Sequence, residues 1–237
     1  MSVWAFSDIH GNRKLFDAIK NFIKEDDTVY FLGDACDRGE DGWEIIKEIL
    51  ADERFIYLKG NHEDMLVKAF FEQMEEDCSN HHEMDLWFWN GGQPTANGMG
   101  YDKVKEVINI VNKLSNLPLT AKYINKNGEL IHMSHAGFSM GIDNPTNQEW
   151  IWDRTHFLDN KWAGPDNAIV IHGHTPIPSL VEKLSFYNPD LRDEDIQPGA
   201  FWYCDGHKIC IDCGTHFTGC AVLLNLDTFD EEIFMVE

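Results

Sequence analysis

The sequence has few cysteines, few basic side chains and no long run of apolar residues. Its 237 residues include 6 cysteines, which are too sparse for a disulfide scaffold and fit reduced thiols in the cytosol. No segment approaches the roughly 18 consecutive apolar residues that a membrane span requires, so we expect no membrane role. The first residues, Met1 to His10, contain no lysine or arginine and do not resemble a secretory signal. We therefore expect a cytoplasmic protein.

The scarcity of basic residues also limits the possible partners. The chain has 41 acidic against 19 basic side chains, which gives a formal net charge of -22. A protein that follows a phosphate backbone usually carries a basic stripe, and we find none, so we expect no nucleic-acid ligand. The length and the apolar fraction of 43% are typical of one globular domain with a sizeable core.

Strand-like and helix-like segments alternate in the first third of the chain. Short apolar runs at 2–6, 28–32 and 54–58 predict strands, and apolar residues at helical spacing follow each of them. Asp41 and Glu44 have the spacing of a capping pair and predict the start of the second helix. The order β-α-β-α-β-α implies parallel strands in an α/β fold.

Beyond Pro118 the pattern changes to strands and turns. Asn-Gly at 127–128 and Asp-Gly at 205–206 are hairpin signals, and the runs 208–211 and 219–224 are typical of late strands. A second sheet is the natural inference. Because these strands are too few to bury a core alone, they belong to the same domain as the N-terminal third.

We expect a single domain over 1–237 with two insertions. The first, about 78–116, is acidic, aromatic and glycine-rich before it leads into a clear amphipathic helix, and is interpreted as a helical insertion. The second, about 178–207, is interpreted as a loop or hairpin insertion. Its aromatic residues fit either a lid over a substrate or a folded surface loop with a small core of its own.

Five polar clusters interrupt the apolar pattern, and each lies where a predicted strand ends in a loop. Open α/β sheets usually assemble their sites at this edge. The clusters are Asp8-Ile9-His10-Gly11, Gly33-Asp34-Ala35-Cys36-Asp37-Arg38-Gly39, Gly60-Asn61-His62-Glu63, Ser134-His135-Ala136-Gly137 and His172-Gly173-His174-Thr175. Each alone is also typical of a turn, a helix cap or a solvated ion pair. Together they supply the ordered set Asp, His, Asp, Asn, His and His. These are oxygen and nitrogen donors, with no thiolate among them, that suit manganese, iron or zinc.

With these clusters in view, the chain resembles the phosphoprotein phosphatase branch of the calcineurin-like metallophosphoesterases. The likeness is strongest to the compact serine/threonine phosphatases of bacteria and bacteriophages, and it extends over nearly the whole chain. Besides the five clusters it includes Asn90-Gly91-Gly92, Leu117-Pro118-Leu119, Ile151-Trp152-Asp153-Arg154 and Ile211-Asp212-Cys213-Gly214. The resemblance implies a four-layer α/β fold in which two mixed β-sheets pack face to face and are flanked by α-helices.

The resemblance also implies two divalent metal ions, with manganese expected and iron or zinc as alternatives. By position it assigns Asp8 and His10 to one ion and makes Asp34 the bridge to the second. The second site is completed by Asn61, His135 and His174. Two ions about 3.5 to 4 Å apart need a bridging carboxylate and lower the pKa of a shared water. The resulting hydroxide is the expected nucleophile for in-line attack on phosphorus.

The remaining assignments concern the substrate. Arg38 and Arg154 match the family's phosphate-binding arginines, and Asn61 is expected to contact the substrate as well as a metal ion. His62 matches the general acid that protonates the leaving alkoxide, and Asp37 matches the carboxylate that orients it. For Asp37 the alternative is a side chain that only stabilises the turn.

Two details favour phosphomonoesters over phosphodiesters. Many phosphodiesterases of this fold have another histidine two places after the one at 174, where this chain has Pro176, and they usually lack the pair Asp37 and Arg38. The implied enzyme is a metallophosphatase for phosphoserine or phosphothreonine in a phosphoprotein, with phosphotyrosine also open. The alternatives are a small phosphorylated substrate, notably a symmetrical dinucleoside tetraphosphate, and an inactive binding module of the same fold.

Overall fold

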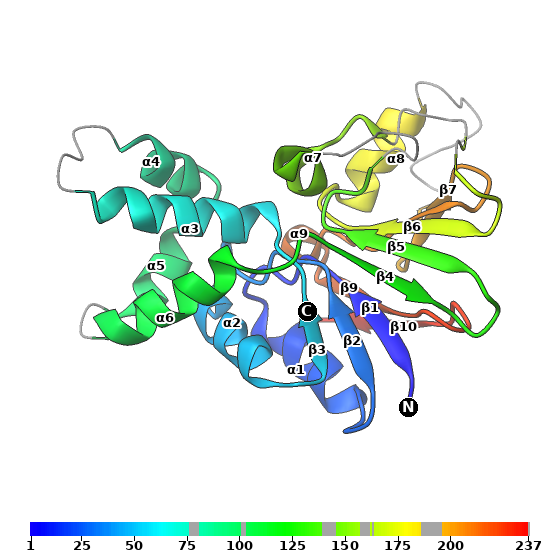
Figure 1. The fold of residues 1–237 in the computed structure, drawn as a ribbon, viewed down its shortest axis with the longest axis horizontal. Helices are drawn as coiled ribbons and strands as arrows, with labels where there is room; N and C mark the ends of the chain where they lie inside the picture. Colours follow the sequence, from blue (N-terminus) through cyan, green and yellow to red (C-terminus); the bar gives the residue numbers. More distant parts are fainter. Residues whose placement is uncertain are drawn as a thin grey trace.

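Two five-stranded mixed sheets form the centre of the molecule, and helices flank them on both sides (Figure 1). The computed structural model describes residues 1–75, 81–100, 103–138, 146–156, 162, 164–185 and 196–236. The predicted four-layer α/β arrangement is confirmed. Among the helices within these ranges, none has the length and apolarity needed to cross a membrane.

The first sheet combines the N-terminal strands with the last two strands of the chain. In the order β10-β9-β1-β2-β3, it consists of β10 (Glu231–Met235), β9 (Cys220–Asn225), β1 (Val3–Phe6), β2 (Thr28–Phe31) and β3 (Phe55–Tyr57). β2 pairs in parallel with both β1 and β3, as the alternating pattern predicts. β9 lies antiparallel to β1, and β10 is the edge strand.

Helices α1 (Arg13–Phe22) and α2 (Gly42–Ala51) connect these parallel strands. The side chain of Asn12 caps α1 by accepting a hydrogen bond from the backbone N–H of Leu15. The predicted start of α2 is confirmed, because Asp41 occupies the N-cap position, but the side chain of Asp41 makes no capping hydrogen bond. With φ −98° and ψ 11°, its backbone lies outside the extended conformation that N-cap residues usually adopt.

The second sheet has the order β4-β5-β6-β8-β7 and confirms the inference of a second sheet. Its strands are β4 (Thr120–Ile124), β5 (Leu130–Ser134), β6 (Ala168–His172), β8 (Lys208–Cys210) and β7 (Phe201–Tyr203). β6 is parallel to β5 and β8, whereas the β4-β5 and β7-β8 pairs are antiparallel. The helices of this half are α7 (Asn147–Trp152), α8 (Ile177–Ser185) and α9 (Thr215–Thr218).

Alternate side chains of the first sheet enter two different cores. Trp4 and Phe6 pack with the apolar faces of α1 and α2, whereas Ala5 between them packs with strands of the second sheet. Ile131 and Ile171 line the same inner core from the second sheet. The two sheets therefore pack face to face, and burial of this core fixes how their edges meet.

A lobe of helices lies beside the first sheet (Figure 1). It consists of α3 (Asn61–Gln73), α4 (His82–Trp89), α5 (Gln93–Met99) and α6 (Val104–Ser115). α3 packs against α4 and α6, and α5 packs against α2. α4 to α6 lie in the stretch 78–116, of which 78–80 and 101–102 are outside the described residues. β7 and all of α8 except Ile177 lie in the stretch 178–207, of which 186–195 is outside them. That both stretches are insertions stays a prediction.

Candidate active site

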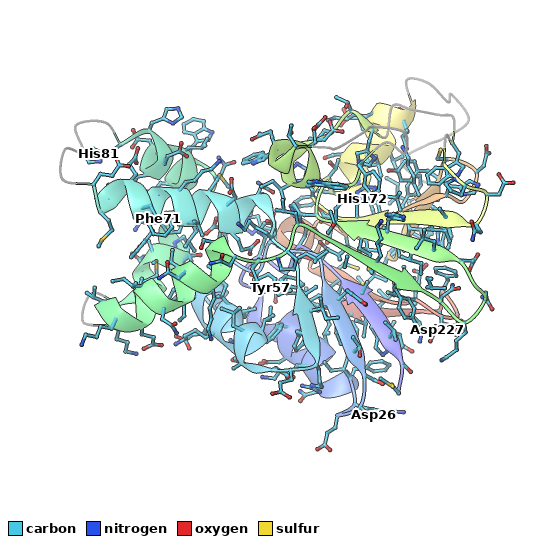
Figure 2. All side chains as sticks on the ribbon, viewed as in Figure 1. Asp26, Tyr57, Phe71, His81, His172 and Asp227 are labelled. Atoms are coloured by element: carbon cyan, nitrogen blue, oxygen red, sulfur yellow. The ribbon has the colours of Figure 1, made fainter. Side chains whose placement is uncertain are left out.

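The loops after β1, β2, β3, β5 and β6 meet at one edge, between the two sheets. Because the neighbouring strands β1-β2-β3 and β5-β6 are parallel, their carboxyl ends lie side by side. Tyr57, which ends β3, and His172, which ends β6, are labelled in Figure 2 near this edge. Hydrogen bonds and short contacts connect the predicted site residues, which are Asp8, His10, Asp34, Asp37, Arg38, Asn61, His62, His135, Arg154 and His174.

The backbone at this edge is unusual. Left-handed φ angles occur at Asp8 (53°), His10 (44°), Asp34 (63°), Asp37 (70°), Arg38 (66°) and His174 (65°). For a residue with a Cβ this conformation costs about 1 kcal/mol or more, and it persists where the surrounding structure fixes it. Its concentration in the predicted clusters is typical of a functional site.

Two groups of buried ligand atoms share the side chain of Asp34. One group is His10, Asp34 and His62, the other is Asp8, Asp34 and His135, and the atoms of each group lie within 4.8 Å of one another. Oδ2 of Asp34 is 3.7 Å from Nε2 of His10 and 3.4 Å from Nε2 of His135. Asp34 thus lies between the two groups, where a bridging carboxylate would be needed.

Asn61 and His174 extend the second group. Oδ1 of Asn61 is 2.9 Å from Nε2 of His135 and 2.9 Å from Nδ1 of His174. The backbone N–H of His174 donates to Oδ2 of Asp8 at 3.1 Å. Asp8, which the resemblance assigns to the first ion, also lies 3.9 Å from Nε2 of His10, so it borders both groups.

Glycine at position 173 allows the fifth loop to reach the first. A Cβ on Gly173 would lie 2.1 Å from Oδ2 of Asp8 and 2.2 Å from Oγ of Ser7. No side-chain atom fits at such distances. The absence of a side chain between His172 and His174 therefore lets the backbone N–H of His174 reach the carboxylate of Asp8.

The two predicted phosphate-binding arginines contact the ligand groups directly. Nη1 of Arg38 is 2.8 Å from Nε2 of His10, and its Nη2 is 3.2 Å from Nε2 of His62. On the other side, Nε of Arg154 donates to Nε2 of His174 at 3.0 Å. Both guanidinium groups can donate several hydrogen bonds in a planar arrangement, which suits phosphate oxygens.

His62, a member of the first group, forms a buried pair with Asp37. Nδ1 of His62 is 2.6 Å from Oδ2 of Asp37, and the ring's Nε2 is 3.8 Å from Oδ2 of Asp34. Burial lowers the pKa of His62, but the carboxylates of Asp34 and Asp37 outweigh it and raise the pKa above its ordinary value. Because Nδ1 of His62 contacts Asp37, the other ring nitrogen, Nε2, faces Asp34.

The electrostatics of the two groups fit divalent cations. Burial raises the pKa of Asp34, but the imidazoles of His135 and His62 pull it well below its usual range. Burial lowers the pKa of His135, and the carboxylate of Asp34 more than offsets this and raises it to about 10. The two carboxylates of Asp8 and Asp34 are buried and require nearby positive charge for compensation. Oxygen and nitrogen donors of this kind suit manganese, iron or zinc.

If His135 is a metal ligand, as the resemblance implies, metal binding at pH 7 is expected to release about one proton, because the imidazole must lose the proton that its raised pKa retains. The affinity for metal should therefore rise with pH until His135 is deprotonated in the metal-free protein, at about 10. Calorimetric titration of the metal-free protein with Mn²⁺, in buffers of different ionisation enthalpy, measures the proton count. Binding at pH 7 with no proton release would contradict the assignment of His135 as a ligand.

Sequence reasoning assigned no role to Glu63, which holds the loop of Asp34. Its carboxylate accepts backbone hydrogen bonds from Asp34 at 2.9 Å, Ala35 at 2.8 Å and Gly60 at 2.8 Å, and one from the Tyr57 hydroxyl at 2.8 Å. Burial, together with the nearby Asp34, raises the pKa of Glu63. A glutamate three residues after a helix N-cap was the available signal, although it indicates only the contact with Gly60.

Replacing Glu63 by Gln is expected to lower the free energy of unfolding by about 2–4 kcal/mol. The amide NH₂ would oppose at least one of the N–H groups that the carboxylate now accepts, and that donor would be buried without a partner. Urea denaturation measures the change.

Glu72→Gln on the same helix is the matched control for Glu63. Its carboxylate accepts the backbone N–H groups of Glu83 and Met84 near the surface, so we expect a clearly smaller change. Equal destabilisation by the two variants would contradict the special importance of Glu63.

Comparison with known proteins agrees with this geometry. A sequence profile of the calcineurin-like phosphoesterases matches residues 1–207. The chain belongs to the calcineurin-like phosphoesterase family. Members of this family are phosphoester hydrolases with a dinuclear metal centre, and the two ligand groups around Asp34 are the candidate centre in this member. Its substrates are therefore phosphorylated molecules.

Solved structures share the fold of this calcineurin-like phosphoesterase at low identity. A structure provisionally described as a diadenosine tetraphosphatase is 17% identical with a TM-score of 0.60, and the match covers 98% of this chain and 92% of that one. A Saccharomyces cerevisiae serine/threonine phosphatase with similarity to human phosphatase PP5 is 14% identical, with a TM-score of 0.54 and coverage of 100% and 80%. A cold-active protein-tyrosine phosphatase of a Shewanella species is 15% identical, with a TM-score of 0.54 and coverage of 98% and 80%. No curated protein sequence matches significantly.

Proposed function

We propose that the protein is a metal-dependent phosphomonoesterase that dephosphorylates phosphoserine and phosphothreonine in proteins. The observation that carries the proposal is the arrangement around Asp34. The imidazole of His62 is hydrogen-bonded to the carboxylate of Asp37 and contacts the guanidinium of Arg38 at the first ligand group. Arg154 lies beside the second ligand group. This arrangement supplies cation ligands, hydrogen-bond donors for a phosphate group and a proton donor within one buried site.

The two ions would be held by Asp8, His10, Asp34, Asn61, His135 and His174. When bound, divalent ions would polarise the phosphoryl group and lower the pKa of water at the site. The low pKa values of His10 and His174, which burial lowers well below the ordinary value, keep these imidazoles neutral and able to bind metal. We propose manganese as the ion.

The substrate phosphate would be held by Arg38 and Arg154. Their guanidinium N–H groups now donate to imidazole nitrogens, and the same groups can donate to the non-bridging oxygens of a phosphomonoester. Because one arginine lies beside each ligand group, the two guanidinium groups would stabilise the charge that develops on the phosphoryl oxygens from two sides. A diester, with only two non-bridging oxygens, would use fewer of these donors.

His62 would protonate the leaving oxygen of the serine or threonine side chain. Asp37 accepts from Nδ1 of His62, which leaves Nε2 toward the ligand groups and therefore toward the reacting phosphate. The carboxylates of Asp34 and Asp37 raise the pKa of His62 and so favour the protonated ring that a general acid requires.

A manganese-supplemented panel of substrates tests the proposal. The panel contains phosphoserine and phosphothreonine peptides, p-nitrophenyl phosphate, its bis-ester and a dinucleoside tetraphosphate. We expect hydrolysis of the peptides and of p-nitrophenyl phosphate, with little turnover of the bis-ester. Preference for the bis-ester would overturn the proposal of a monoesterase. Preference for the dinucleoside tetraphosphate would overturn the proposal that the substrate is a protein. No turnover of any of these compounds would overturn the catalytic function.

A further inference from the structure

The loop that carries Asp37 and Arg38 is held by the segment of α4 and α5. The backbone N–H of Asp37 donates to Oγ1 of the buried Thr95 at 2.8 Å, and the backbone N–H of Arg38 donates to the carbonyl of Gly91 at 2.9 Å. Asp37 and Arg38 both have left-handed φ angles, which persist only where surrounding contacts fix them. The shape of this loop therefore depends on the helical lobe.

Trp87 on α4 makes a further contact with this loop, to the side chain of Asp37. Its indole Nε1–H lies 3.0 Å from Oδ1 and 2.9 Å from Oδ2 of Asp37. Both side chains are buried, with Trp87 2% exposed and Asp37 0% exposed. Oδ2 is also the oxygen that lies 2.6 Å from Nδ1 of His62. An indole and an imidazole thus converge on one buried carboxylate.

We propose that Trp87 is a positioning residue for the general acid. Its N–H fixes the rotation of the Asp37 carboxylate, and the fixed carboxylate in turn aims Nε2 of His62 at the leaving oxygen. Trp87 acts through Asp37 and does not touch the substrate. This inference rests on the proposed function, in which His62 protonates the leaving group.

The competing interpretation is that Trp87 only fills the apolar core, to which its ring also belongs. The two interpretations predict different effects of the leaving group on the loss of rate. A serine alkoxide needs a proton as it leaves, whereas p-nitrophenolate is stable without one. Loss of positioning should therefore slow a phosphoserine peptide much more than p-nitrophenyl phosphate, and loss of packing should slow both equally.

Trp87→Phe keeps an aromatic ring in the core and removes only the N–H donor. We expect kcat for the phosphoserine peptide to fall about tenfold or more, and kcat for p-nitrophenyl phosphate to stay within about twofold of the wild type. KM for both substrates and the manganese content, measured by mass spectrometry of the purified protein, should not change.

Trp4→Phe is the matched control, because Nε1 of Trp4 also donates to a buried carboxylate, Oδ2 of Asp27, at 3.3 Å. That contact is distant from the site: Asp26, the neighbour of Asp27, is labelled at the opposite end of the first sheet in Figure 2. We expect Trp4→Phe to leave both kcat values unchanged. A selective loss with the peptide in this control would overturn the role of Trp87.

Gly92→Ala provides a second perturbation if Trp87→Phe does not fold. A Cβ at position 92 would lie 2.5 Å from Nε1 of Trp87 and would push the indole aside without removing it. The same selective loss with the peptide is expected. Equal losses on both substrates, or no loss on either, would overturn the positioning role.

Asp37→Asn, measured in parallel, separates this inference from the proposed function. If Asp37→Asn shows the selective loss and the variants at positions 87 and 92 do not, only the role of Trp87 is overturned. If Asp37→Asn lowers kcat equally for the phosphoserine peptide and p-nitrophenyl phosphate, the assignment of the general acid fails, and the role of Trp87 is overturned with it.

Discussion

Asp34→Asn is expected to lower kcat by about 10³-fold or more and to reduce the number of bound metal ions. Oδ2 of Asp34 lies 3.7 Å, 3.8 Å and 3.4 Å from Nε2 of His10, His62 and His135, and Oδ1 accepts the backbone N–H of His62 at 3.0 Å. An amide carries no charge and places a donor where one of these oxygens lies. The two ligand groups would then no longer share a carboxylate.

Metal content by mass spectrometry and turnover of p-nitrophenyl phosphate test this prediction together. Asp41→Asn is a suitable control, because Asp41 is in the same connection between β2 and α2 and its side chain makes no capping hydrogen bond. Asp34→Asn protein that retains two ions and nearly normal turnover would contradict the central position of Asp34. The control should match the wild type in both measurements.

Asp37→Asn should lower turnover of a phosphoserine peptide by about 100-fold or more while the metal content stays unchanged. The carboxylate of Asp37 accepts hydrogen bonds from two donors, Nδ1 of His62 at 2.6 Å and Nε1 of Trp87 at 2.9 Å. The asparagine amide would present its own N–H to one of them. Either His62 loses its orientation, or the buried indole loses its acceptor and is displaced.

Steady-state kinetics and metal analysis of the same preparation check this result. Asp64→Asn on α3 is the control, since Asp64 forms an ion pair with Lys68 at 2.8 Å and neither residue is among the predicted site residues. Parallel losses of turnover and metal in Asp37→Asn would indicate a structural role for Asp37 instead. The control should lose neither.

Local patterns in the sequence were sufficient to predict the parallel N-terminal strands and a second sheet, whereas the four-layer packing was implied by the family resemblance. Apolar runs bounded by turns predicted the strands β1, β2 and β3 to within two residues, and their alternation with helices predicted the parallel pairing. The polar clusters at the strand ends predicted one shared edge, because parallel strands bring their carboxyl ends together. The resemblance to metallophosphoesterases then supplied the expected ligands, which the structure brings into contact.

The capping prediction at Asp41 shows the limit of such patterns. Residue types and spacing favoured a cap there, but the backbone angles in the loop after β2 prevent it. This loop also makes contacts with a segment distant in the sequence, such as the backbone hydrogen bond from Gly39 to the carbonyl of His10 at 3.1 Å. A local pattern does not contain contacts of this kind.

The sequence by itself determined the two-sheet α/β fold, the edge at which the polar loops meet and the chemical types of the site residues. Only the tertiary structure decided what holds those residues in place. Trp87 reaches Asp37 across 50 positions of sequence, and Glu63 reaches the backbone of Asp34 across 29. The physical reason is that helical and strand periodicity records neighbours within one element, whereas these contacts depend on how α4 and the loop after β2 pack against α3.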